Sequence, residues 1–230
     1  MSPTVTVYSC ITGNFDKAEL AIRRSGALAE SNVSYVLFSD SATGTIKAKD
    51  TTWDVRPLQY TASLPCNRRR SRWHKLNSHV LFPDSDFTLW IDGSQQFKDG
   101  VQPYLQLIKP LLSSPLDLHT FKHPDRTCIY QELSACIRLN KDNELLMRRQ
   151  IARYKEYGYP PYSGLVETAC ILRRKSLAVS AFNKCWWQEL KQNSLRDQLS
   201  FNYVAWKLKF PYGRIPGCRS DSAYFTFVGH

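Results

Sequence analysis

One carboxylate follows directly on an apolar run in the middle of the chain. Residues 87–91 read Phe-Thr-Leu-Trp-Ile, and Asp92-Gly93-Ser94 come next. A run this short and this rich in β-forming residues predicts a buried strand. A carboxylate at the exit of such a strand lies at the edge of an α/β sheet, where these folds bind ligands. The alternative is a plain turn, because Asp-Gly is also common turn chemistry.

A cluster of basic residues precedes this strand. Residues 67–79 predict a helix on which Arg68, Arg72 and Lys75 share one face, with Arg69 and Arg72 neighbours at i, i+3. Such a cluster repels itself unless an anion or a carboxylate neutralises it, and arginine forks match phosphate oxygens. The sequence favours a pyrophosphate clamp here over the alternative, a solvated basic face.

Two later segments carry further candidate residues. His119 and His123 have the spacing of a metal pair on a helix, but Pro124 argues against a helix there, so residues 123–126 are interpreted as an active-site loop. Near residue 194, Ser194 predicts a helix N-cap with Asp197 at the third helical position. That pattern gives Asp197 a structural alternative to a catalytic role.

The elements that must position these residues alternate along the chain. Strands are predicted over residues 5–10, 32–40, 53–59, 87–91, 116–121 and 168–172, and helices over residues 15–25, 67–79, 101–112, 127–140, 144–157 and 177–192. Residues 41–52 read as a loop, and residues 211–230 as irregular structure with one short strand. This order predicts an α/β fold in a single domain, with a doubly wound sheet. The first turn, Thr12-Gly13-Asn14, matches neither GxGxxG nor a P-loop.

Composition restricts the partners more than the fold. The 230 residues carry a net charge of +11, which suits a polyanion or a phosphorylated small substrate; a solvated basic surface is the alternative. Seven scattered cysteines without a CxxC argue against a disulfide framework and a structural zinc site. No apolar run is long enough to span a membrane and no signal-peptide pattern opens the chain, so we expect a cytoplasmic protein.

Taken in order, short motifs along nearly the whole chain resemble a glycosyltransferase-like family with plant and bacterial members, TOD- and mucilage-related and long without an assigned function. The matching motifs are Tyr8-Ser9-Cys10-Ile11-Thr12-Gly13-Asn14-Phe15-Asp16, Phe38-Ser39-Asp40, Arg72-x-x-Lys75-x-x-x-His79, Trp90-Ile91-Asp92-Gly93-Ser94, His123-x-x-Arg126-x-Cys128-x-Tyr130-x-Glu132, Gly164-Leu165-x-Glu167, Arg173-Arg174, Trp187-x-Glu189 and Ser194-x-Arg196-Asp197-Gln198-Leu199-Ser200-Phe201. The dipeptide Asp197-Gln198 is also similar to the Asp-Gln-Asp motif of glycogenin-like retaining transferases.

The resemblance implies a GT-A-like fold, a mixed sheet flanked by helices, with a nucleotide-binding half (1–100) and an acceptor-binding half (101–230). It implies transfer of a sugar from a nucleotide-sugar donor, with UDP as the expected nucleotide, to a hydroxyl. The implied donor-binding residues are Thr12, Gly13, Asn14, Asp40, Arg69, Arg72, Lys75, Asp92, Gly93 and Ser94. The implied sugar- and acceptor-binding residues are His123, Arg126, Glu132, Gly164, Leu165, Arg196 and Gln198. Glu167 and Asp197 are the implied catalytic residues, as base or as stabiliser of an oxocarbenium-like transition state.

The resemblance also implies a divalent metal, Mn²⁺ or Mg²⁺, on Asp92. This sequence departs from a full DxD motif, because Ser94 stands where the second carboxylate would be. The expected consequence is a weak metal site, a site completed by His230, or replacement of the metal by the basic helix.

The acceptor stays open at the level of sequence. The charge of +11 fits an anionic glycan or a hydroxylated base of a nucleic acid such as DNA, which would have to be flipped out of a duplex. A non-catalytic nucleic-acid-binding protein is the main alternative, although no helix-turn-helix, zinc-finger or RNP motif supports it. A hydrolase on the same scaffold is the third hypothesis.

Overall fold

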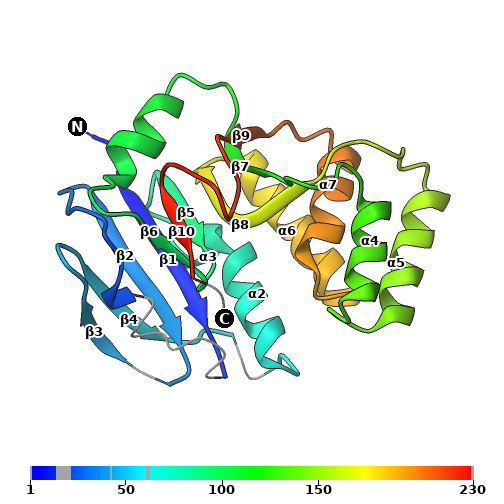
Figure 1. Ribbon diagram of the computed structural model, residues 1–230, viewed down its shortest axis with the longest axis horizontal. Coiled ribbons are helices and arrows are strands. Elements are labelled where there is room, and N and C mark those ends of the chain that lie inside the picture. The colour runs from blue at the N-terminus through cyan, green and yellow to red at the C-terminus, as the bar shows by residue number, and fades with distance from the viewer. Residues whose placement is uncertain (1, 14–21, 42, 61–62, 229–230) are drawn as a thin grey trace.

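A mixed sheet of eight strands runs through the computed structural model, which describes residues 2–13, 22–41, 43–60 and 63–228 (Figure 1). Its strands are β1 (Val5–Ile11), β2 (Val33–Ser39), β3 (Gly44–Lys47), β4 (Thr52–Pro57), β5 (Phe87–Ile91), β7 (Leu118–Lys122), β8 (Val166–Arg174) and β9 (Gly213–Ile215). Their order across the sheet is β3-β4-β2-β1-β5-β8-β7-β9. Two further strands, β6 (Gln95–Phe97) and β10 (Phe225–Phe227), form an antiparallel ribbon of their own.

The strands at the centre of the sheet are parallel, so the carboxyl ends of β1, β2 and β5 lie at the same edge. Strands β4, β2, β1 and β5 run parallel, whereas β8 pairs antiparallel with both β5 and β7. Since β1 lies between β2 and β5, the strand order reverses beside it, and ligands bind outside the carboxyl ends of the strands at such a point. The residues that follow these three strands are Thr12, Asp40 and Asp92.

Two apolar cores lie on opposite faces of the sheet, because side chains alternate along each strand. Tyr8, Phe38 and Trp90 belong to the core beneath the helices, and Val7 and Leu89 to the other. The helices are α2 (Asn67–Leu76), α3 (Ser78–Leu81), α4 (Ile129–Arg138), α5 (Glu144–Glu156), α6 (Leu177–Gln192) and α7 (Asp197–Lys207). In Figure 1, α2 lies near the centre of the molecule and α4 to α7 gather on the right.

The predicted fold class is confirmed: an α/β single domain with a mixed sheet flanked by helices. Four local predictions are corrected. The helix over 67–79 breaks at Asn77 into α2 and α3. Residues 101–112 form a π-helical turn, η1 (Pro103–Ile108), and a 3₁₀ turn, η2 (Lys109–Leu111), instead of an α-helix, in a segment where Pro110 lacks the N–H that a regular helix needs. The expected loop 41–52 contains β3, and the tail contains two short strands. Most of the predicted helix 15–25 lies outside the described residues.

A buried histidine joins α2 to the chain after β4. His74 is fully buried, its Nδ1 lies 2.8 Å from the Arg70 carbonyl, and its Nε2 accepts a hydrogen bond from the Gln59 N–H at 3.0 Å. The proton of the neutral ring therefore sits on Nδ1. Burial lowers the pKa of His74 to about 4.

This histidine predicts a loss of stability in mild acid. The unfolded chain binds a proton near pH 6.5 that the folded protein excludes until about pH 4, so stability falls as pH drops through that window. Between pH 7 and pH 5 the expected loss is about 2 kcal/mol of unfolding free energy. Urea denaturation at both pH values measures it. His74→Gln keeps an acceptor for the Gln59 N–H and should lose less unfolding free energy between these pH values than the wild type. An equal loss in both proteins would contradict the assignment of this pH effect to His74.

Candidate active site

A cavity of about 460 Å³ opens at the carboxyl edge of the central strands. Its walls come from the ends of β1 and β5, the start of β8, one face of α2, one face of α4 and the N-terminus of α7. Six cationic side chains and four carboxylates line it: Arg68, Arg72, Arg126, Lys141, Arg196 and Arg219, with Asp92, Glu132, Glu167 and Asp197. This excess of positive charge favours an anionic ligand.

Lys75 lies beneath the cavity and joins its two central carboxylates. Its side chain is 1% exposed, and Nζ is 3.0 Å from Asp92 Oδ1, 2.6 Å from Asp197 Oδ2 and 3.3 Å from Thr168 Oγ1. The Lys75 carbonyl accepts hydrogen bonds from the Tyr8 hydroxyl and from the buried Arg173 guanidinium, each at 3.1 Å. Lys75 is therefore held at both ends, and its charge is matched by carboxylates instead of being free for phosphate.

Asp197 is the first residue of α7, which corrects the predicted cap. The N-cap is Arg196, and the Ser194 hydroxyl instead donates to Asp142 Oδ2 at 2.8 Å. Burial alone would raise the pKa of Asp197, but Arg72, Lys75 and Arg196 outweigh it and hold that pKa well below its usual range. These cations therefore favour the ionised form of Asp197 at neutral pH.

Three arginines form one wall of the cavity. Arg68 and Arg72 extend from α2, and Arg196 immediately precedes α7. Burial lowers the pKa of Arg68, and repulsion from Arg72 and Arg196 lowers it further, so the three charges act on one another. Asp197 Oδ1 is 3.7 Å from Arg72 Nε, and the buried Arg196 Nε has no hydrogen-bond partner. We call Arg68, Arg72 and Arg196 the arginine wall.

Two predicted donor-binding residues lie away from this wall. The Arg69 guanidinium donates to the carbonyls of Leu190 and Lys191, at 2.6 and 2.9 Å, and so caps the end of α6. Asp40 accepts the Gly13 N–H with both carboxylate oxygens, at 3.0 and 2.9 Å, and borders a separate open hollow of about 440 Å³. Arg69 is thus not part of the cavity, and Asp40 faces a neighbouring one.

On the α4 side, Glu132 gathers the predicted acceptor residues. Its carboxylate accepts from Arg126 Nε at 2.7 Å and lies 3.8 Å from Arg196. Arg126 also contacts His123 Nε2 at 2.7 Å, and burial together with the Arg126 charge lowers the pKa of His123, so this ring is neutral at pH 7. Gly164 and Leu165 are not in the lining; the Leu165 carbonyl instead accepts the His123 N–H at 2.9 Å.

Glu167 faces the same cavity from β8. Burial raises its pKa; Arg219 opposes that shift with its backbone N–H, which donates to Oε2 at 2.8 Å, and with its guanidinium, while the charges of Asp92 and Asp125 add to it. A carboxyl group that lines a cavity and has a raised pKa is a candidate for proton transfer in catalysis.

The described residues do not by themselves build a metal site. Asp92 Oδ1 already accepts hydrogen bonds from Lys75 Nζ and from Trp90 Nε1, which leaves Oδ2. Ser94 is buried, and His230 lies outside the described residues. Within residues 2–13, 22–41, 43–60 and 63–228, no three His, Cys, Asp or Glu side chains are grouped as ligands. A divalent ion on Asp92 would need its other ligands from substrate phosphates and water.

The structure thus brings most predicted site residues together. Thr12, Gly13, Arg72, Asp92, Gly93, Ser94, His123, Arg126, Glu132, Glu167, Arg196, Asp197 and Gln198 line the cavity, with Lys75 beneath it. Arg69, Asp40, Gly164 and Leu165 do not line it, and Asn14 and His230 are outside the described residues. Sequence reasoning missed Thr168, Lys141 and Arg219; Thr168 adjoins Glu167, but nothing in the irregular tail singled out Arg219.

The fold and the cavity together describe an α/β domain with a cationic cavity and carboxylates at the switch point of its sheet. A family model described as "TOD1/MUCI70, glycosyltransferase-like domain" matches residues 1–216, so the chain belongs to that family.

Two relatives from Arabidopsis thaliana are similar to this chain. A probable hexosyltransferase, MUCI70, is 26% identical over 220 residues, which cover 89% of this chain and 37% of the relative. The alkaline ceramidase TOD1 is 31% identical over 135 residues, which cover 55% of this chain and 29% of that protein. The matches therefore cover little more than a third of the first relative's length and less than a third of the second's. Among the described residues, no helix combines the length and apolarity that crossing a bilayer requires.

Proposed function

We propose that this domain transfers a sugar from a nucleotide-sugar donor, with UDP as the first nucleotide to test, to a hydroxyl acceptor. The observation that carries the proposal is that the arginine wall lines the same cavity as Asp92 and Glu167. The charges of Arg72 and Arg196 disfavour that of Arg68, so an anion beside this wall would be stabilised, and a diphosphate offers the oxygen geometry that guanidinium forks match. The similarity to a probable hexosyltransferase supports a sugar as the transferred group.

In this reaction the bond from the anomeric carbon to the diphosphate breaks, and the diphosphate leaves with the electron pair. The arginine wall would stabilise that charge, which is the largest single contribution a preorganised site can make. The acceptor oxygen bonds to the anomeric carbon, and Glu167 takes up the hydroxyl proton. Asp197 holds Lys75 and Arg72 in place. A divalent ion, if bound through Asp92, would share in neutralising the diphosphate.

The acceptor we propose is a hydroxyl on an anionic polymer, a glycan or a nucleic acid. The net charge of +11 supports this choice, because lysine and arginine contacts to a polyanion supply affinity. The six cations that line the cavity exceed its four carboxylates by two, about the charge of a bound diphosphate, so the attraction for such a chain rests on the rest of the protein's positive charge.

A thermal-shift panel tests the donor site. Nucleoside diphosphates and nucleotide sugars, each with and without Mn²⁺, should raise the melting temperature if they bind the folded state. We expect Arg72→Ala to weaken the best ligand about ten- to a hundred-fold, because a hydrogen bond to a charged group is lost. Arg149→Ala is the matched control, since Arg149 is exposed on α5 outside the cavity. A shift that needs Mn²⁺ and disappears in Asp92→Asn would establish the metal.

The panel, together with a nucleic-acid binding assay and a donor-hydrolysis assay, separates the alternatives. If no nucleotide raises the melting temperature while DNA or RNA binds with a steep salt dependence, the domain is a nucleic-acid-binding module and the proposal fails. Donor hydrolysis that no acceptor outcompetes would instead indicate a hydrolase on this scaffold.

A further inference from the structure

Arg219 reaches the cavity from a segment far along the chain. It lies between β9 and β10, and the β10–β6 pairing fixes this segment beside the Asp92 turn. The Arg219 carbonyl accepts from Gln95 Nε2 at 3.3 Å, and Lys98 Nζ donates to the Ser222 carbonyl at 2.7 Å. Gly217 permits the turn, because its φ is +89° and a Cβ there would lie 2.4 Å from the Asp221 carbonyl oxygen. Residue 219 is therefore held in place by its backbone.

The Arg219 side chain is placed between a carboxylate and open space. Its Nε is 3.4 Å from Glu167 Oε1, yet this Nε is buried and makes no hydrogen bond. The guanidinium lies 4.3 Å from the centre of the Phe227 ring, and the side chain is 40% exposed. Its terminal nitrogens have no hydrogen-bond partner within the described part of the chain. A guanidinium so placed lowers the energy of the Glu167 anion and still has donors for a second anion.

We propose that Arg219 is a positioning residue that sets the protonation of Glu167 and couples it to an anionic oxygen of the bound substrate. Without substrate, the guanidinium charge favours ionised Glu167. When a phosphate oxygen takes the free guanidinium nitrogens, part of that charge is engaged elsewhere, and Glu167 holds a proton more readily. Proton uptake by Glu167 would then be favoured when the donor is present. This coupling rests on the proposed function, but its first step does not.

That first step is tested without any substrate. The pKa of Glu167 is measured by carbon NMR of the side-chain carboxyl groups, which is practical because the chain has only seven glutamates and Glu167→Gln identifies the resonance. In Arg219→Gln the midpoint should move to higher pH than in the wild type. Arg214→Gln, an exposed arginine five residues earlier and outside the cavity, should leave it unchanged. Arg219→Lys should restore it in part, since the charge returns while the planar fork does not.

The second step uses inorganic pyrophosphate as the probe. We expect Arg219→Gln to bind it about ten-fold more weakly than Arg214→Gln, as for a lost hydrogen bond to a charged group. The backbone N–H of residue 219 bonds Glu167 in every variant, so a purely structural role would leave the Glu167 midpoint in place.

The outcomes separate this inference from the proposed function. A Glu167 midpoint that is the same in wild type, Arg219→Gln and Arg214→Gln overturns the inference, even if nucleotide sugars bind. A midpoint that rises in Arg219→Gln alone supports the first step, even if no nucleotide sugar binds and the transferase proposal fails. Equal pyrophosphate affinity in Arg219→Gln and Arg214→Gln overturns the coupling to substrate.

Discussion

Lys75→Met should lower the free energy of unfolding by about 3–5 kcal/mol, the cost of removing one partner from a buried ion pair. The Lys75 ammonium is the charge between Asp92 and Asp197, and the Asp197 side chain is only 2% exposed. Methionine fills the space of the lysine stem but removes the cation between the two carboxylates, and Asp197 keeps only the more distant Arg72 and Arg196 charges. Urea denaturation measures the change.

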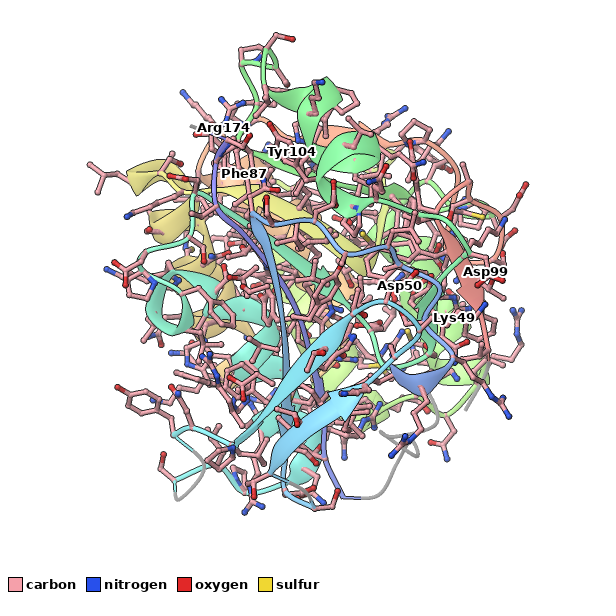
Figure 2. All side chains as sticks on the ribbon, turned by 90° about the vertical axis from the view of Figure 1, so that its left-hand side faces the viewer. Lys49, Asp50, Phe87, Asp99, Tyr104 and Arg174 are labelled. Atoms are coloured by element: carbon pink, nitrogen blue, oxygen red, sulfur yellow. The ribbon has the colours of Figure 1, made fainter. Side chains whose placement is uncertain are left out.

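Lys49→Met is the matched control. Lys49 also forms an ion pair, 2.6 Å from Asp99, but these side chains are 57% and 75% exposed (Figure 2). Exposed pairs contribute little, so the expected cost is below about 1 kcal/mol. Adding Asp197→Asn to Lys75→Met should recover part of the loss, because one unpaired charge is removed. Equal costs for the two lysines would show that Lys75 is not the central cation of the site.

Glu167→Gln should reduce sugar transfer by about 10²- to 10⁴-fold, the usual contribution of a general base. The same change should make the protein more stable at neutral pH. Since the pKa of Glu167 is raised in the folded state, the folded protein holds a proton that the unfolded chain has lost, and stability falls as pH rises through that window. Glutamine removes this titration and can still accept the Arg219 N–H.

Two measurements check this pair of effects. The melting temperature of Glu167→Gln minus that of the wild type should increase as pH rises from 4 to 8, a difference that cancels the His74 effect common to both proteins. Transfer is measured on whichever donor the thermal-shift panel identifies. Glu144→Gln is the control, since Glu144 is 54% exposed and its ion pair among the described residues is with Arg148 on the same helix. A Glu167→Gln enzyme that transfers at the wild-type rate would rule out Glu167 as the base.

The sequence predicts the strands, and the carboxylate that follows β5, better than it predicts the roles of the cations on α2. Short apolar runs predict buried strands, and the run of β5 ends abruptly at a carboxylate, so the sequence singles out Asp92. The helical spacing correctly placed Arg72 and Lys75 on one face, but spacing does not show which cations are buried. Lys75 is paired with carboxylates that come from β5 and α7, and Arg69 binds carbonyls at the end of α6.

The irregular segments were the least predictable. The tertiary contact of the Ser194 hydroxyl with Asp142 outweighs the cap pattern, and the helix starts two residues later than predicted, at Asp197. Arg219 entered the site through a turn and a two-stranded ribbon with partners more than a hundred residues away, and no local pattern encodes such a contact. Predictions from residues adjacent in sequence fail where contacts with residues distant in sequence determine the local structure.

The β6–β10 ribbon also bears on the order in which this domain folds. It pairs Phe97 with Phe225, so the cavity acquires Arg219 only after well over 200 residues have left the ribosome. Long-range pairings of this kind form slowly, because the chain loses loop-closure entropy before the new contacts stabilise it. The parallel centre of the sheet is complete in sequence by β5, long before that. The domain is therefore expected to pass through a stage with a formed sheet and an unfinished cavity, a species that chaperones and proteases would meet before any ligand does.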